Sequence, residues 1–372
     1  MSSDNNKLLT LVLILLITMA GLIYIWLNLE NKNFLTSKLQ PAKKYVIPKT
    51  FLSMPPEKPK EHKWLFFGDL MLDRDIGAKI QEHGLDFIFA NLVKQDQSFF
   101  QDYELVAANL EGAVSTDGEH YAPGVPYDFA FSPKIIESLN QDYNFNFFTI
   151  ANNHVTDQGS RGLEETRLNL EELGIDFVGC PDTEVEECSS KIINKEKYNL
   201  GMVGLSMVYH MLNTDAAVEQ VQAMASSTDF VIVNIHWGVE YEHQFNKVQQ
   251  NLAHSLIDAG ADLIIGHHPH VVQGMEIYQD KAIFYSLGNF VFDQYFSADT
   301  QEELALKINY LPSGKASKNE SLIIELIPLR SEASQIRLLD IDEKQTFLSN
   351  FFLWSQADEQ YHDQIISGNI SL

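Results

Sequence analysis

Six short apolar runs, each followed closely by Asp, Glu, Asn or His, constrain this 372-residue chain more than any other feature. They have the length and the polar bounds of buried strands. The runs are Trp64–Phe67, Leu105–Ala108, Phe145–Ile150, Phe230–Ile235, Leu263–Ile265 and Ile283–Leu287. Helical periodicity lies between several of them, over Ser160–Leu173 and Asn246–Ala259, with a glycine after each. This alternation predicts an α/β domain with a largely internal sheet. After Asn289 only Ser321–Ile327 resembles a strand, and we expect the rest to be irregular.

The side chains that follow these runs have the chemistry of a metal site. They are Asp69, Asn109, Glu111, Asn153, His154, His236, Glu240, His267, His268, His270, Asn289 and Asp293. Because ligands bind outside the carboxyl ends of parallel strands, we expect these side chains to share one rim. Carboxylates, amides and imidazoles form the ligand set of a Mn, Zn or Fe site and not that of a thiolate site. The number of these side chains is enough to bind two ions.

Each position alone also has a structural explanation. Asp69 follows a glycine and could be an ordinary turn residue. Asn109 and Glu111 could cap a helix, and His154 could be a satisfied polar residue. The segment His267–His270 is harder to explain by packing, because three imidazoles in four residues are costly to bury unpaired. The metal interpretation therefore depends on the occurrence of all these groups together.

Several other features leave two interpretations open. Asp73 and Arg74 form either a rim ion pair or a contact to a substrate phosphate, and Asp293 either orients a ligand or caps a turn. The acid-rich run Asp182–Glu187 predicts a solvated loop. Cys180 and Cys188 are the chain's two cysteines and could form a disulfide outside the cytoplasm.

The N-terminal region predicts a membrane anchor. Leu8–Leu27 is a run of 20 residues without a charge, which as a helix spans about 30 Å, the thickness of a hydrocarbon core. A cleaved signal peptide is the alternative, but the run is long for one and no small-residue cleavage site follows it. We therefore expect a tail over residues 1–7, an anchor over 8–29, a Lys- and Pro-containing linker over 30–63, a main domain over 64–330 and a C-terminal extension over 331–372.

The charge distribution excludes one class of partner and gives a weak signal on topology. The chain has a formal net charge of −25, and residues 64–372 hold 17 Lys and Arg against 47 Asp and Glu. No basic face for nucleic acid is expected in such a body. Lysines are more numerous after the apolar run than before it, which by the positive-inside rule would place the body in the cytoplasm.

Six ordered motifs resemble the CapA-type poly-gamma-glutamate capsule biosynthesis proteins, relatives of the calcineurin-like metallophosphoesterases. The motifs are Gly68–Arg74, Asn109–Gly112, Ala151–His154, His236–Tyr241, Gly266–His270 and Tyr285–Asp293. The resemblance implies a four-layer α/β sandwich with a dinuclear metal site, preceded by one transmembrane helix.

The resemblance also implies roles for individual residues. Asp69 and His270 would bind the first metal ion, and Glu111 would bridge the two ions. Asn153, His236 and His268 would bind the second ion, and His154 would protonate the leaving group or stabilise the transition state. The remaining candidates would contact substrate or support the ligands, and they are Arg74, Asn109, Asp157, Glu240, His267, Asn289 and Asp293.

The chain departs from the phosphoesterase pattern in two places. Those enzymes carry Asp-x-His at the first strand, whereas the third residue here is Met71. Their second motif is Gly-Asp, whereas here it is Asn109-Leu110-Glu111. One metal ion therefore loses an imidazole. CapA-type relatives share these departures.

The function implied by the resemblance is that of a membrane-anchored component of poly-gamma-glutamate synthesis or export, with a metal-dependent hydrolase-type site. The expected partners are the cytoplasmic membrane, polymer synthase or export subunits and the anionic polymer. The resemblance places the body outside the cytoplasmic membrane, whereas the distribution of lysines around the apolar run would place it in the cytoplasm. One alternative is a non-catalytic assembly subunit. Another is a general phosphoesterase, for which a phosphate-clamping cluster of arginines is expected, although the body has only five.

Overall fold

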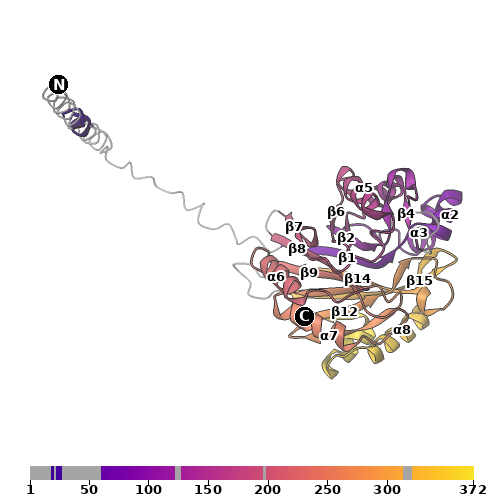
Figure 1. The fold of residues 1–372 in the computed structure, drawn as a ribbon. Coiled ribbons are helices and arrows are strands. Elements are labelled where there is room, and N and C mark those ends of the chain that lie inside the picture. Colours follow the sequence, from indigo (N-terminus) through magenta and orange to yellow (C-terminus); the bar gives the residue numbers. More distant parts are fainter. Residues whose placement is uncertain (1–17, 21, 27–59, 122–126, 196–197, 313–320) are drawn as a thin grey trace, which may run out of the picture. The chain divides into compact units, whose positions relative to one another are not determined.

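The computed structural model describes residues 18–20, 22–26, 60–121, 127–195, 198–312 and 321–372 (Figure 1). The chain divides into two compact units, Met1–Glu57 and Lys58–Leu372. Residues 18–20 and 22–26 of the first unit are helical. No helix within the described residues is both long and apolar enough to cross a membrane. Most of the predicted anchor, the predicted tail and most of the predicted linker lie outside the described residues.

Two large sheets form the centre of the second unit. The first has nine strands. Its main path runs β16 (Gln335–Leu338), β15 (Ser321–Glu332), β14 (Glu302–Leu311), β1 (His62–Leu70), β2 (Leu105–Leu110), β5 (Phe147–Thr149) and β6 (Asp176–Val178). In addition, β13 (Asn289–Val291) pairs with β1 and β17 (Asn369–Ser371) pairs with β15. Strands β1, β2, β5 and β6 are parallel, so their carboxyl ends lie at one edge.

The second sheet has six strands and a parallel centre. Its order is β11 (Val272–Tyr278), β12 (Lys281–Leu287), β10 (Leu263–His267), β9 (Phe230–Trp237), β8 (Tyr198–Met207) and β7 (Ser190–Lys195). A small ribbon pairs β3 (Ala113–Val114) with β4 (Ala130–Phe131). The strands expected from the six apolar runs are therefore present.

Helices cover the outer faces of both sheets (Figure 1). Those against the nine-stranded sheet are α2 (Arg74–His83), α3 (Asp86–Gln95), α4 (Pro133–Tyr143) and α5 (Gly159–Glu172). Those against the six-stranded sheet are α6 (Thr214–Ala225) and α7 (Lys247–Asp258). The patterns over Ser160–Leu173 and Asn246–Ala259 are confirmed as α5 and α7. The predicted mixed α/β fold is confirmed for the described part of the chain.

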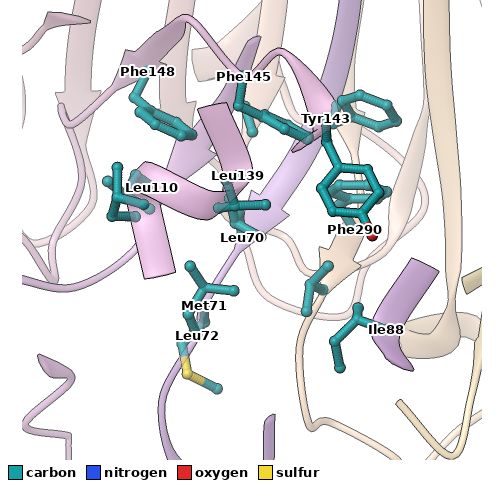
Figure 2. Packing of buried hydrophobic residues seen from close by; sticks show 14 of the residues in the cluster. Leu70, Met71, Leu72, Ile88, Leu110, Leu139, Tyr143, Phe145, Phe148 and Phe290 are labelled. Carbon is teal, nitrogen blue, oxygen red and sulfur yellow. The ribbon is translucent and has the colours of Figure 1, made fainter. Parts of the chain in front are cut away.

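Alternating side chains along each strand explain this stacking. On β1, Leu65 and Phe67 pack under the helices, whereas Trp64 and Phe66 face the core between the two sheets. Both faces are apolar, as expected for parallel strands covered on both sides. Figure 2 shows part of the core under the helices, where Met71 lies among buried apolar side chains.

The prediction that the C-terminal tail is irregular is wrong. Residues after β16 form α8 (Ile341–Trp354), α9 (His362–Ser367) and strand β17. Phe347, Leu348 and Phe351 of α8 are buried in the core between the sheets. The periodicity of this region is weak because α8 buries only a narrow stripe of its surface, so the pattern in the sequence does not stand out.

Candidate metal centre

The predicted site residues converge at the carboxyl-end edge, where the two sheets meet. Asp69 lies near the end of β1, and Asn109 pairs with it in register on β2. His236 and His267 occupy the matching positions of β9 and β10. Because all four strands run in parallel within their own sheets, strand ends separated by up to 198 residues reach one place.

Close approach of backbone explains the glycines beside these residues. A Cβ atom on Gly68 would stand 1.9 Å from the carbonyl oxygen of Gly288, and one on Gly266 would stand 2.0 Å from that of Tyr285. Any side chain at these two positions would push neighbouring strands apart. Glycine therefore allows Asp69 and His267, each one residue further along, to enter the site.

Asn109 connects the two carboxylates. Its Nδ2 lies 2.8 Å from Asp69 Oδ1, 3.1 Å from Glu111 Oε1 and 3.2 Å from Nδ1 of His236. Asp69 and Glu111 are both completely buried. Glu111 Oε2 has no hydrogen-bond partner among the described residues. An amide therefore holds two carboxyl groups close together and leaves one of their oxygens unpaired.

The histidines after β10 have unusual backbone conformations. His268 and His270 have φ values of 95° and 56°, a region that non-glycine residues rarely occupy and that is often found at functional sites. Nδ1 of His270 donates to Asn289 Oδ1 at 2.9 Å and lies 3.3 Å from Asp69 Oδ2. Because an amide oxygen only accepts, this contact leaves Nε2 of His270 as the nitrogen that can bind a metal ion.

His154 forms a dyad with Asp157. Its Nδ1 donates to Asp157 Oδ2 at 2.9 Å, and its Nε2 accepts from Asn153 Nδ2 at 3.0 Å. Asn153 Oδ1 in turn lies 2.8 Å from Nε2 of His236. The ring of Phe129 packs 4.6 Å from the ring of His154, centroid to centroid. The dyad thus adjoins the two residues that the resemblance places on the second metal ion.

Arg74 and Asp293 form an ion pair at the rim. Arg74 Nε donates to Asp293 Oδ2 at 3.0 Å, and a second guanidinium nitrogen contacts the other carboxylate oxygen. The guanidinium also lies over Phe129, 4.9 Å from the ring centroid. Arg74 is therefore fixed beside the ring that packs on His154. This favours an ion pair for Arg74 over a free phosphate contact, but the partner is Asp293 and not the predicted Asp73, which accepts from the Arg74 backbone N–H.

Burial and mutual repulsion give the two carboxyl groups different protonation states. Burial and the nearby charge of Asp69 raise the pKa of Glu111 well above its ordinary value. Burial also works to raise the pKa of Asp69, but hydrogen bonding and charge from His270 outweigh it and lower that pKa. In the metal-free chain, Asp69 is therefore the charged member and Glu111 retains a proton.

Burial keeps the imidazoles neutral. It lowers the pKa of His268 to about 3 and that of His267 to about 4, and it lowers the pKa of His236 well below its ordinary value. A neutral imidazole is the form that binds metal ions. The buried histidines are thus ready to bind without losing a proton.

The donor set fits divalent metal ions. Ligand atoms of Asp69, Glu111 and His270 lie within 4.8 Å of one another, and so do those of Glu240, His268 and His270. In addition to Glu111 Oε2, Nδ1 of buried His268 has no hydrogen-bond partner among the described residues. Oxygen and imidazole donors of this kind match Mn, Zn or Fe.

Sequence reasoning missed two residues that support the centre. Asn152 donates to Asn109 Oδ1 at 3.1 Å and accepts from the His154 backbone N–H at 3.0 Å. Glu303 on β14 accepts from the Gly68 N–H at 2.8 Å and is buried. Asn152 lies inside a recognised motif, but nothing in its type distinguishes it from Asn153. Glu303 lies beyond the last motif and gives no signal in the sequence.

The disulfide and the acidic run support the rim on the side of β8. Cys180 and Cys188 are joined by a disulfide, which closes a loop containing Asp182. Asp182 accepts from the backbone N–H groups of Val208 and Tyr209, at 2.9 and 3.1 Å. The Tyr209 hydroxyl lies 3.4 Å from Asn153 Nδ2. The prediction that Asp182–Glu187 is simply solvated is therefore wrong for Asp182, which is only partly exposed and fixes the segment beside Asn153.

Fold and site together define a mixed α/β protein with a buried centre of carboxylates and imidazoles between two sheets. Residues 63–294 match the family described as bacterial capsule synthesis protein PGA_cap, and the chain belongs to that family.

Named relatives agree with this assignment. The chain is similar to the capsule biosynthesis protein CapA of Bacillus anthracis, with 26% identity over 82% of this chain and 79% of the relative. It is also similar to the PGA biosynthesis protein CapA of Bacillus subtilis, with 31% identity over 62% of this chain and 63% of the relative. A solved structure described as a novel phosphatase from Mycoplasma pneumoniae is also similar, with 14% sequence identity and a TM-score of 0.42. The match covers 72% of this chain and 94% of the chain in that structure. That last likeness is too distant to support an inference about activity.

We expect metal binding to release a proton from Glu111. At about pH 5.5 the wild-type chain should release about one proton more per chain on binding Mn²⁺ than the Glu111→Gln variant does. For each pH unit, the Mn²⁺ affinity of the wild type should therefore rise by a factor about tenfold larger than that of the variant. The reason is that the raised pKa of Glu111 keeps this group protonated until a cation replaces the proton. Calorimetric titration with Mn²⁺ in two buffers of different protonation enthalpy measures the difference.

Glu303→Gln is the matched control for this experiment. Burial raises the pKa of Glu303 as well, but Glu303 holds the Gly68 N–H and belongs to neither group of candidate ligands. Its substitution should leave the proton count unchanged. Equal proton release from the wild type and Glu111→Gln would contradict the role of Glu111 as a ligand.

Proposed function

We propose that the chain is a membrane-anchored component of poly-gamma-glutamate capsule synthesis or export and that its metal centre has hydrolase-type activity. One observation carries the catalytic part. Carboxylates from one sheet and imidazoles from the other meet in a buried cluster with unpaired ligand atoms, which would be costly without a cation. The capsule and PGA biosynthesis names of the relatives support the polymer.

The proposed centre holds two ions in a four-layer fold of the metallophosphoesterase type. Asp69 and His270 would hold the first ion, in keeping with the place of their ligand atoms in one group within 4.8 Å. Glu111 would bridge, because it belongs to the same group as Asp69 and also lies 3.7 Å from His236. The second ion would be bound by Asn153, His236 and His268. The 2.8 Å contact between Asn153 Oδ1 and His236 Nε2 supports a shared ion.

The chain's own residues would handle the proton. Divalent ions, when bound, supply a nucleophile derived from water and neutralise charge on the reacting group. Asp157 holds the Nδ1 proton of His154, so Nε2 is the atom that would take up a second proton and pass it to the leaving group. Phe129 covers one face of this imidazole, which is 7% exposed, and limits access of water to it.

We propose that the body lies outside the cytoplasmic membrane. The disulfide between Cys180 and Cys188 supports this side, because such bonds persist in oxidising compartments. The cytoplasmic membrane, polymer synthase or export subunits and the anionic polymer would be the partners. The net charge of −25 gives the chain no general affinity for the polymer, so contact would depend on the metal centre.

A non-catalytic assembly subunit is the second candidate. The observation that favours it is Met71, which occupies the position of a ligand in related phosphoesterases but is fully buried in the apolar core. A site with one imidazole fewer could keep its fold and lose its chemistry. A general phosphoesterase is less well supported, because Asp293 already pairs with Arg74 at the rim.

Metal content and polymer production together test the proposal. We expect the purified full-length wild-type chain to contain about two Mn, Zn or Fe ions. Asp69→Asn should lose at least one ion, and a strain that carries it should make no polymer. Asp176→Asn is the control, because Asp176 is half exposed and pairs with Lys191 on the surface. Absence of metal from the wild-type chain would remove the catalytic proposal, whereas normal polymer with Asp69→Asn would favour the assembly subunit.

A further inference from the structure

His267 is buried without a hydrogen-bond partner for either ring nitrogen among the described residues. Its exposed fraction is 1%. Each buried polar atom without a partner costs about 1–3 kcal/mol, so an imidazole with two such atoms needs an explanation. His268 has one unpaired nitrogen and His270 is hydrogen-bonded, which makes His267 the least satisfied of the three histidines after β10.

Strand alternation places the His267 side chain in the space between the sheets. Leu263 and Ile265 on β10 face the core between the sheets, whereas Ile264 faces the helices on the other side. His267 continues the inward-facing series and pairs in register with His236 on β9. Its ring therefore faces the same region as a proposed ligand of the second ion.

Asp69 lies between two imidazoles. Nδ1 of His267 is 3.6 Å from Asp69 Oδ1, and Nδ1 of His270 is 3.3 Å from Asp69 Oδ2. A separation of 3.6 Å is too long for a hydrogen bond. It is close to the spacing of two donors on one tetrahedral ion, which is about 3.4 Å for bonds of about 2.1 Å.

Met71, two residues after Asp69, is not a partner of that carboxylate in the site. Its side chain is completely buried and packs in the core under the helices, with its sulfur accepting from the Asp73 N–H at 3.1 Å (Figure 2). The carboxyl end of β1 therefore contributes a carboxylate but no imidazole. His267 comes from the opposite sheet and reaches the same carboxylate.

We propose that His267 is a metal ligand that shares an ion with Asp69 and supplies the imidazole that the carboxyl end of β1 lacks. The inference rests on the proposed metal centre. It differs from a role in which His267 only orients Asp69, because a ligand bonds to the ion itself.

Cobalt spectroscopy of His267→Cys tests the direct bond. The two cysteines of the chain are joined in a disulfide, so a new cysteine would be the only thiol. The full-length variant loaded with Co²⁺ is expected to show a thiolate-to-cobalt charge-transfer band, with one thiolate per chain. Ile265→Cys is the control, since Ile265 lies two residues earlier on the same inward face and should give no band. A variant that binds cobalt without the band overturns the proposal.

Metal affinity of His267→Ala gives a second readout. We expect one of the two Mn²⁺ or Zn²⁺ ions to bind at least about 100-fold more weakly to this variant than to the wild type. Such a loss of affinity is larger than is usual when a residue that only supports a ligand is replaced. His254→Ala is the matched control, because His254 on α7 pairs with Glu276 on β11 and is not a candidate ligand. Unchanged affinity for both ions overturns the proposal. Failure of the wild-type chain to bind any metal ion is a separate result, which overturns the proposed centre as a whole.

Discussion

Substitution of His154 by alanine is expected to lower turnover at the metal centre by about 10²- to 10⁴-fold. A strain that carries only this variant should stop producing polymer. The reason is that Nε2 of His154 is the proposed proton donor once it has taken up a proton, and Asp157, which accepts from Nδ1, stabilises the protonated ring. Metal content should not change, because His154 is not a proposed ligand of either ion and both of its ring nitrogens have other partners, Nδ1 in Asp157 and Nε2 in Asn153.

Asp157→Asn separates the two parts of this dyad. Its amide can still contact the ring but stabilises a protonated imidazole poorly, so we expect a smaller loss than with His154→Ala. His362→Ala is the control, because His362 pairs with exposed Asp363 near the C-terminus. Polymer yield and metal content should be measured in the same strains. Normal polymer from a folded, metal-loaded His154→Ala chain would contradict a catalytic role.

Most of the candidate site could be predicted because the ends of buried strands can be recognised in the sequence. Asp69, His236 and His267 each follow an apolar run, and parallel pairing brings such positions to one edge whatever their separation along the chain. The type of each residue then indicates its chemistry. The apolar runs do not predict which residues of the two sheets contact one another. An example is the 3.2 Å contact between Nδ2 of Asn109 and Nδ1 of His236.

Supporting residues were harder to predict because their roles depend on hydrogen bonds alone. Glu303 is 234 residues from Asp69, and only the structure shows that it holds the Gly68 N–H beside Asp69. Asp182 looks like any acid in an acidic run, yet its carboxylate fixes the Tyr209 segment. Composition and spacing predict ligand types, whereas the residues that orient the ligands carry no comparable pattern.

The C-terminal region was missed for a different physical reason. Strand β17 completes one side of β15, and α8 closes the core between the sheets, but the segments are short and their apolar residues are unevenly spaced. Ile341 and Leu353 on α8 are 88% and 74% exposed, so apolar residues occur on both faces of the helix. This obscures the period of 3.6 residues on which a helix prediction depends.

Phe351→Ala is therefore expected to destabilise the body by about 3–5 kcal/mol, the usual cost of removing a fully buried aromatic ring. Phe351 is completely buried in the core between the sheets. Leu353→Ala, two residues further along the same helix, should change the free energy of unfolding by at most about 0.5 kcal/mol, because its side chain is exposed. Urea unfolding of the full-length variants measures both values. Similar small effects at the two positions would mean that α8 is peripheral, whereas the expected contrast would make it part of the core that holds the two halves of the metal centre together.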